Sequence, residues 1–135
     1  MNHASLVLRL KHYEELKDRR FLLEALEMGI TLRLLSRRLS DYSGEVYWYA
    51  LLPEFEDKRP LIRNYSLIKV GTPYDYGSLF KQMVARVPSD PKRFFCSEYC
   101  YMAYKAAGLP VISEKAPRPG DLPGLGIFKP AVRIW

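Results

Sequence analysis

Apolar and polar residues alternate near the start of the chain, and this period of two predicts a β-strand. Over residues 3–10, Leu6, Leu8 and Leu10 fall on one face of an extended segment, whereas the polar positions, beginning with His3, fall on the other. The charged stretch that follows connects this strand to the next apolar segment and has room for one helical turn.

Two more strands are expected over residues 21–26 and 30–35, joined by a tight turn. Gly29 supplies the positive φ that such a turn requires. A helix over residues 21–28 is the rival interpretation, since leucine, alanine and glutamate all favour helices; we prefer the two strands. A further strand is expected over residues 46–52, which are rich in tyrosine and tryptophan.

The pattern changes to a helical period in the second half of the chain. Pro60 is well placed to open a helix and Gly71 to close it. Leu61, Tyr65 and Ile68 lie on one apolar stripe of this helix.

Two more helices are expected, over about residues 77–87 and about residues 96–107, the second of which Gly108 stops. Residues 113–125 are rich in proline and glycine, so we expect a surface loop there. The C-terminal residues 127–135 can add a short edge strand.

This order of strands first and helices second predicts an α+β fold rather than an alternating α/β fold. We expect one domain over residues 1–135, in which an antiparallel sheet from the N-terminal half packs against the C-terminal helices. The apolar fraction of 48% suffices for one core at this length and argues against disorder.

Composition and charge exclude some classes of protein. No run approaches the roughly 18 apolar residues that a membrane-spanning helix needs. The N-terminus lacks the basic and apolar regions of a secretory signal, so we expect a cytoplasmic location, or export by a route that uses no signal.

The net charge of +6 makes an anionic partner worth testing, but the basic residues are spread along the chain without a nucleic-acid-binding signature. We therefore do not expect nucleic acid as the partner.

Cys96 is the first candidate for chemistry. It follows the segment 93–95, which we expect to be extended, and stands at the expected start of a helix, where free N–H groups and the helix dipole stabilise a thiolate. The alternative is that Cys96 is a small buried hydrophobic residue, the commoner role of a lone cysteine. Cys100 lies one turn later, and we assign it to packing rather than to a metal or a redox pair.

A cysteine nucleophile needs a base, and the chain has only His3 and His12. His3 is the better candidate, because a strand end holds a side chain more rigidly than a loop does. Glu24 is a candidate partner for that histidine, because a carboxylate on the leucine-rich face of a strand is costly unless it is paired. A glutamate on the polar face of a short helix is the alternative. Glu98 has a sufficient role as a favourable charge in the first turn of the expected helix.

Several short motifs together resemble one family. The pentapeptide Phe95-Cys96-Ser97-Glu98-Tyr99 resembles the Cys-Ser-Glu signature of the circularly permuted papain-like cysteine peptidases and amidases, the YiiX-type relatives of NlpC-type cell-wall endopeptidases. In that branch the strands come first and the cysteine helix last, as they do here. The remaining matches are to the histidine strand, the strand of the third polar residue, a Gly-x-x-Tyr segment and the end of the cysteine helix, at residues 2–8, 23–30, 71–77 and 106–109.

The resemblance implies a permuted papain-like fold and a thiol hydrolase that cleaves an amide or peptide bond through an acyl-enzyme. It assigns Cys96 as nucleophile, His3 as general base and Glu24 as the residue that orients the histidine. Tyr74, the backbone N–H of Cys96 and Ser97 would serve the oxyanion or the substrate. The implied substrate is a peptide, such as a cell-wall fragment, and neither a metal nor a cofactor is expected.

Two other functions remain open. One is a thiol acyltransferase for lipid or amide substrates, although the related lecithin retinol acyltransferases carry an Asn-Cys-Glu-His setting that this chain lacks. The other is an inactive binding module on the same fold, with an anionic polymer or a cell-wall ligand. The family usually carries one more strand before the histidine strand, whereas only two residues precede His3 here. Either this is a minimal version of the fold or upstream sequence is missing, and a missing strand would leave the sheet edge open beside the histidine strand.

Overall fold

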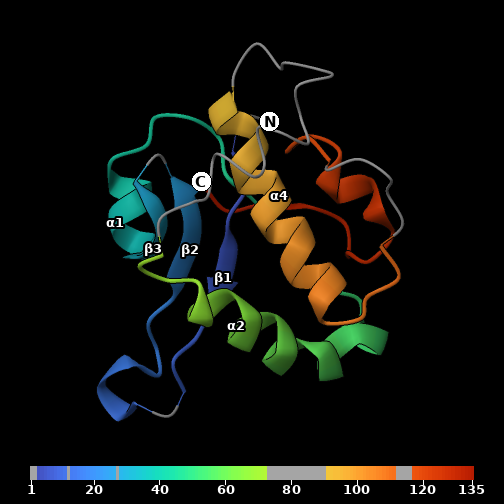
Figure 1. Cartoon of the computed structure of the whole chain (residues 1–135). Coiled ribbons are helices and arrows are strands. Elements are labelled where there is room, and N and C mark those ends of the chain that lie inside the picture. The colour runs from blue at the N-terminus through green and yellow to red at the C-terminus, as the bar shows by residue number, and fades with distance from the viewer. Residues whose placement is uncertain (1–2, 12, 27, 73–90, 112–116) are drawn as a thin grey trace.

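The computed structural model describes residues 3–11, 13–26, 28–72, 91–111 and 117–135, with only the backbone described at residue 14 and over residues 91–95. Its architecture is mixed α/β, with a small antiparallel sheet and helices beside it (Figure 1). The sheet has the order β1-β2-β3, and its strands are β1 (Leu6–Leu8), β2 (Phe21–Leu26) and β3 (Gly29–Leu34). A mixed fold with an antiparallel sheet from the N-terminal half is therefore confirmed.

The hairpin of β2 and β3 is the part of the sheet that carries Glu24. Gly29 begins β3 opposite Leu26, and its φ of 112° is a conformation that residues with a Cβ atom rarely adopt. Glu24 lies in the middle of β2, opposite Thr31. The expected pair of strands is thus confirmed, and the alternative of a helix over residues 21–28 is wrong.

The first strand is shorter than the pattern predicts. Of residues 3–10, only Leu6–Leu8 pair with β2, in antiparallel register with Leu6 opposite Leu23. Leu6 and Leu8 are buried as expected. A single turn of 3-10 helix, Glu14–Leu16, occupies the charged connection to β2.

A second, two-stranded sheet joins the middle of the chain to its C-terminus. After α1 (Leu35–Ser40), β4 (Tyr47–Trp48) pairs antiparallel with β5 (Val132–Arg133). An isolated bridge between Leu51 and Phe128 extends the contact. The C-terminal edge strand is therefore confirmed. The strand expected over residues 46–52 is regular over two residues only, because beyond β4 this segment and the C-terminal segment share only scattered backbone hydrogen bonds.

Helix α2 (Arg59–Ile68) follows a 3-10 helix over Pro53–Lys58. Its buried residues are Ile62 and Ser66, whereas Leu61 is 50% exposed and Ile68 is 76% exposed. The apolar stripe that the sequence indicates is therefore not the face that the helix buries. The neighbouring α4 (Pro91–Ala106) explains the difference, because its Tyr99 hydroxyl donates a hydrogen bond to the Ser66 carbonyl and brings that face inward.

Helix α4 begins five residues earlier than the sequence predicts. Pro91 is its first residue, a position that proline favours because the missing N–H would have no helical partner. The extended segment expected over residues 93–95 is therefore wrong. The C-terminal end is as expected: Gly108 has a φ of 75° and follows the last helical turn in a left-handed conformation that glycine adopts readily. The helix expected over residues 77–87 lies outside the described residues.

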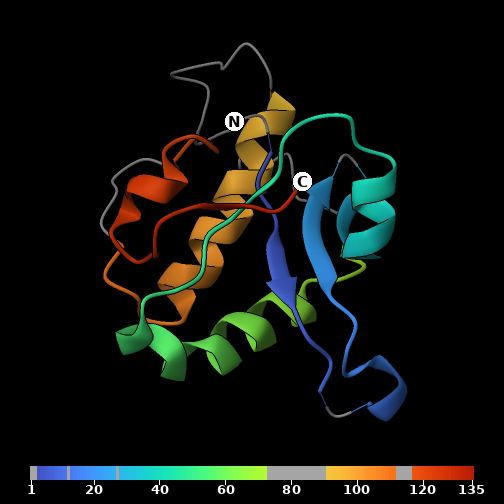
Figure 2. The same cartoon turned by 180° about the vertical axis from the view of Figure 1, so that it is seen from behind.

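The core lies where α4 packs against β2 on one side and against α2 on another. Ala103 and Ile127 are fully buried there. Within the segment expected as a surface loop, Pro117, Pro119 and Leu122 are buried, so that part of the expectation is wrong. Seen from behind, the segments that carry β4 and β5 pass across α4, and the C-terminus ends close to the sheet (Figure 2).

Among the described residues, none of the helices combines the length with the apolar character that crossing a bilayer requires.

Candidate active site

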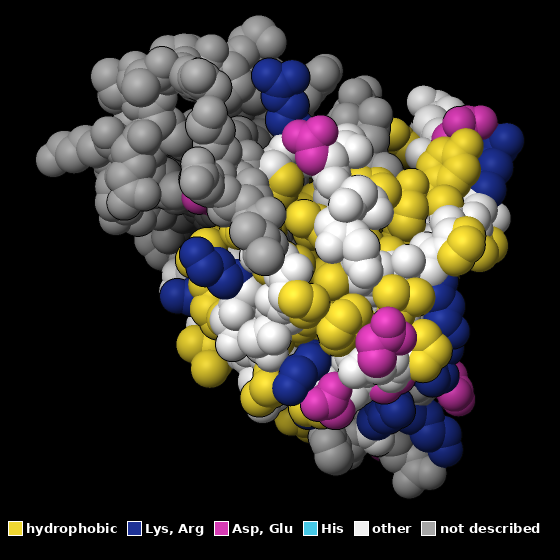
Figure 3. Space-filling view, turned by 90° about the vertical axis from the view of Figure 1, so that its right-hand side faces the viewer, with side chains coloured by type: hydrophobic (Ala, Val, Ile, Leu, Met, Phe, Trp, Pro, Cys, Tyr) yellow, Lys and Arg dark blue, Asp and Glu magenta, His cyan; other side chains and the backbone are white. Residues whose placement is uncertain are grey.

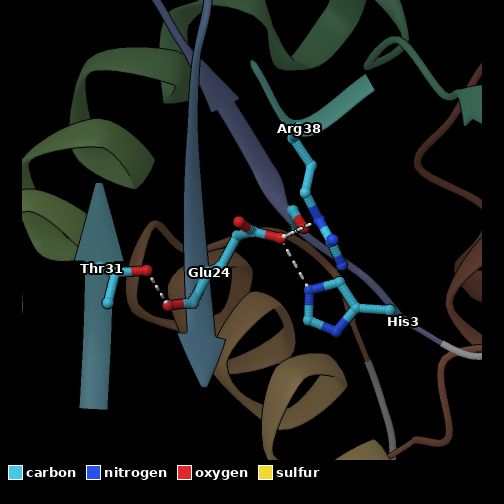
Figure 4. A network of polar contacts seen from close by, with 5 residues as sticks. His3, Glu24, Thr31 and Arg38 are labelled. Carbon is cyan, nitrogen blue, oxygen red and sulfur yellow. Dashed lines mark hydrogen bonds and ion pairs between the residues drawn. The ribbon is translucent and has the colours of Figure 1, made fainter. Parts of the chain in front are cut away.

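His3 and Glu24 face each other across two strands of the sheet. The His3 Nε2 atom lies 3.0 Å from the Glu24 Oε1 atom, and the contact joins the residues just before β1 to the centre of β2 (Figure 4). The Glu24 side chain has no exposed surface, whereas 29% of the His3 side chain is exposed. The expected pairing of the buried carboxylate with this histidine is therefore present in the structure.

Three donors converge on a single oxygen of Glu24. Besides His3, the Ser5 hydroxyl donates to Oε1 at 3.3 Å, and the Arg38 Nε atom lies 3.5 Å from the same oxygen. Burial alone raises the pKa of the Glu24 carboxyl, but the hydrogen bond and charge of His3, with Arg38 and Ser5, outweigh burial and hold that pKa below its ordinary value. Glu24 is thus kept as an anion in a buried position.

The Cys96 side chain is the other partner of His3. Burial alone lowers the pKa of the imidazole, but hydrogen bonds to Cys96 and Glu24 and the charges of both groups outweigh burial and raise the pKa of His3 from 6.5 to about 9. Because Nε2 faces Glu24, Nδ1 is the ring nitrogen left for the thiol. The structure therefore brings together the three residues that the sequence selects.

Cys96 reaches this place by a different local route from the expected one. It is the sixth residue of α4, not the first, so the free N–H groups of the helix start do not act on its sulfur. Its own N–H lies at a position where an α-helix bonds the carbonyl four residues earlier, and it is not free to bind an oxyanion. The histidine, rather than the helix dipole, is the local source of positive charge for this thiol.

Cys100, one turn after Cys96, has the packing role expected for it. Its side chain is 1% exposed, and burial raises the pKa of its thiol far above the ordinary value. It belongs to the hydrophobic core, beside Tyr104 and Ala103.

The remaining candidates differ from expectation. Ser97 has no exposed surface, and its hydroxyl donates to the Pro117 carbonyl at 2.6 Å, so this hydroxyl holds two segments together and is not available to an oxyanion. Glu98 does not lie in the first turn of α4; burial raises its pKa to about 7. Tyr74 lies outside the described residues.

Ser5 and Arg38 are the site residues that sequence reasoning missed. Ser5 stands two positions after His3, and a strand's period of two places it on the same face, so the pattern could have indicated it. Arg38 comes from α1, which no sequence pattern connects with Glu24 in β2. Within the described part of the chain, no group of three histidine, cysteine or acidic side chains is placed to hold a metal ion.

Comparison of the chain with family models, with curated proteins and with solved structures found no match.

Proposed function

We propose that the protein is a cysteine hydrolase that cleaves amide or peptide bonds, with Cys96 as nucleophile, His3 as general base and Glu24 as the residue that orients the base. The observation that carries the proposal is the position of the His3 imidazole, which hydrogen-bonds Cys96 on one side and a buried carboxylate on the other. A nucleophile, its base and an orienting acid in this order form the arrangement of a catalytic triad.

The chemistry follows from the roles of the three side chains. His3 takes the proton of the Cys96 thiol, and the thiolate attacks the carbonyl carbon of the substrate. The tetrahedral intermediate collapses, the amine leaves with the proton that His3 returns, and a thioester remains on Cys96. A water molecule then gives its proton to His3 and attacks the thioester, which releases the acid and restores the thiol. Glu24 stays ionised and stabilises the imidazolium at both steps.

The fold and substrate that we propose rest on the same residues. The segment before β1 that carries the base and the strand β2 that carries the acid precede the helix that carries the cysteine, the order of the permuted papain-like proteins. A peptide substrate, such as a cell-wall fragment, agrees with that resemblance. The enzymatic reaction is favoured over an inactive module because the buried Glu24 carboxylate holds the same imidazole that hydrogen-bonds Cys96.

The decisive experiment compares Cys96→Ala with Cys100→Ala on fluorogenic peptide amides and on peptidoglycan fragments. The two variants remove the same atoms from positions one turn apart on α4, and both cysteines are buried. We expect Cys96→Ala to lower turnover by a factor of about 1000 or more, and Cys100→Ala to lower it by less than about tenfold. Equal turnover by the Cys96→Ala and parent proteins would exclude the assignment.

Alkylation by iodoacetamide gives a readout that needs no substrate. We expect Cys96 to react before Cys100, because the His3 imidazole hydrogen-bonds the Cys96 side chain and can take its proton, whereas burial raises the pKa of the Cys100 thiol. The variant His3→Ala should slow the labelling of Cys96 only, as peptide mass spectrometry can measure. Equal labelling rates at the two cysteines, or no effect of His3→Ala, would contradict the pairing.

A further inference from the structure

A large groove runs along β1 and is also lined by Leu22, Leu23 and Glu24 of β2. Its volume is about 1270 Å³, more than the several hundred Å³ of a typical small-molecule pocket. One wall is formed by residues 3–9, and the opposite wall includes Tyr47, Trp48, Tyr49 and Phe128. The size of the groove favours a peptide over a small molecule as its occupant.

The edge of β1 that borders the groove is open within the described part of the chain, where β1 pairs only with β2. An unpaired strand edge presents N–H and C=O groups that another strand can use. Residues 3–9 line the groove along their whole length, which corresponds to about 23 Å of extended chain. The groove is therefore long enough for about seven residues of an extended peptide beside residues 3–9, of which Leu6–Leu8 form β1.

The charges along the groove have an excess of one sign. Among the described residues that line it, six are basic and three are acidic. Each acid already has a partner: Glu24 has His3, Glu45 pairs with an arginine, and Glu56 does so as well.

The remaining cations have no such partner. Arg9, Lys11, Arg20 and Arg63 line the groove, and none of them forms an ion pair with a described carboxylate. Figure 3 shows one side of the molecule, on which basic and acidic side chains lie next to one another along the lower and right-hand edges and hydrophobic side chains fill much of the middle. The groove thus concentrates positive charge that has no carboxylate partner within the described residues.

We infer that this groove binds an acidic peptide in an extended conformation, as an additional strand on the free edge of β1. Its backbone pairs with β1, aliphatic side chains on one face of the strand contact the aromatic wall, and carboxylates on the other face meet Arg9 and its basic neighbours. The inference concerns binding and goes beyond the proposed reaction. His3 and Glu24 of the candidate active site line the groove, whereas Cys96 does not, and binding does not require the chemistry of Cys96.

The test uses a fluorescent heptapeptide of alternating valine and glutamate and the full chain with Cys96→Ala, so that no turnover consumes the probe. Fluorescence polarisation measures binding to this protein and to the same protein with Arg9→Glu or Lys105→Glu. Arg9 lines the groove, whereas Lys105 is exposed elsewhere on α4 and serves as the matched control. We expect Arg9→Glu to weaken binding by about fivefold or more and Lys105→Glu to leave it unchanged.

Two altered peptides separate strand pairing from charge attraction. Methylation of alternate backbone nitrogens removes the donors of one strand edge and should weaken binding by about tenfold, and replacing glutamate by lysine should abolish it. Equal binding of the acidic and basic peptides, equal effects of the two charge reversals, or undiminished binding of the methylated peptide would overturn the inference. So would a dimer in analytical ultracentrifugation that binds no peptide, because a second copy of the chain would then fill the groove.

Discussion

At the scale of single residues, Glu24 determines how the candidate site is built. A buried carboxylate is costly unless its charge is balanced, and here one oxygen receives His3, Ser5 and Arg38. The second oxygen, Oε2, is buried and has no hydrogen-bond partner among the described residues. The carboxylate is thus bound on one side only, and that side is the one facing the imidazole.

The substitution Glu24→Gln tests this role. The amide keeps the shape of the side chain but removes its charge, so the pKa of His3 should fall from about 9 toward its ordinary value. Turnover should fall by about a hundredfold or more, because the imidazole loses both its orientation and the charge that stabilises its protonated form. NMR titration of the His3 ring measures the pKa, and Glu15→Gln, at an exposed position, is the control. An unchanged His3 pKa would contradict the role.

The pH dependence of stability follows from the same pair. Because the pKa of His3 is higher in the folded protein, about 9 against 6.5, the stabilisation by this group is complete below pH 6.5 and is lost as the pH rises through 9. The loss is on the order of 3 kcal/mol. Glu24 acts in the opposite direction: its pKa is lowered in the folded protein, so its stabilisation is lost as the pH falls below the ordinary glutamate value.

Urea unfolding between pH 6 and pH 10 measures the contribution of His3. The parent protein should lose stability across this range, and His3→Gln should lose much less. Glu98, whose pKa is raised to about 7, titrates in both proteins, so the difference between them isolates the histidine. Parallel pH profiles for the two proteins would show that His3 makes no stabilising contact in its charged form.

At the scale of secondary structure elements, the sequence predicts what depends on neighbouring residues. The hairpin around Gly29 and the paired role of Glu24 follow from local rules: a turn that needs positive φ, and a carboxylate on an apolar strand face. The start of α4 was not predicted, because Pro91 suits either a loop or the first helical position. The contact of Arg38 with Glu24 joins α1 to β2 through tertiary structure, and no local pattern encodes it.

The variant Gly29→Ala tests the hairpin. With a φ of 112°, an alanine at this position is strained, so we expect a loss of at least about 1 kcal/mol in the free energy of unfolding. Gly124→Ala is the matched control, because a Cβ atom there meets nothing within 4 Å and its φ is not positive. Chemical denaturation of both variants gives the comparison, and equal stabilities would contradict the strained turn.

At the scale of the whole molecule, the C-terminal segment connects the helices to the middle of the chain. The Phe128 ring packs edge-on against Tyr104 of α4, with centroids 5.5 Å apart, and against Tyr49, with centroids 6.1 Å apart. Its backbone forms the bridge to Leu51. One side chain therefore contacts both the principal helix and the segment that carries β4.

The variant Phe128→Ala tests whether the chain unfolds as one domain. Removing the ring should lower the free energy of unfolding by about 2 to 3 kcal/mol, whereas Tyr13→Ala, at a position 62% exposed, should change it by less than about 0.5 kcal/mol.

The two tryptophans of the chain both report on the second sheet: Trp48 lies in β4, and the Trp135 indole N–H donates to the Tyr42 carbonyl. In a single cooperative unit, the transition seen by their fluorescence coincides with the loss of helix seen by far-ultraviolet circular dichroism, in the parent and in Phe128→Ala alike. If the fluorescence transition of Phe128→Ala moves to lower denaturant while the helical transition stays in place, the second sheet unfolds independently and the single-domain prediction is wrong.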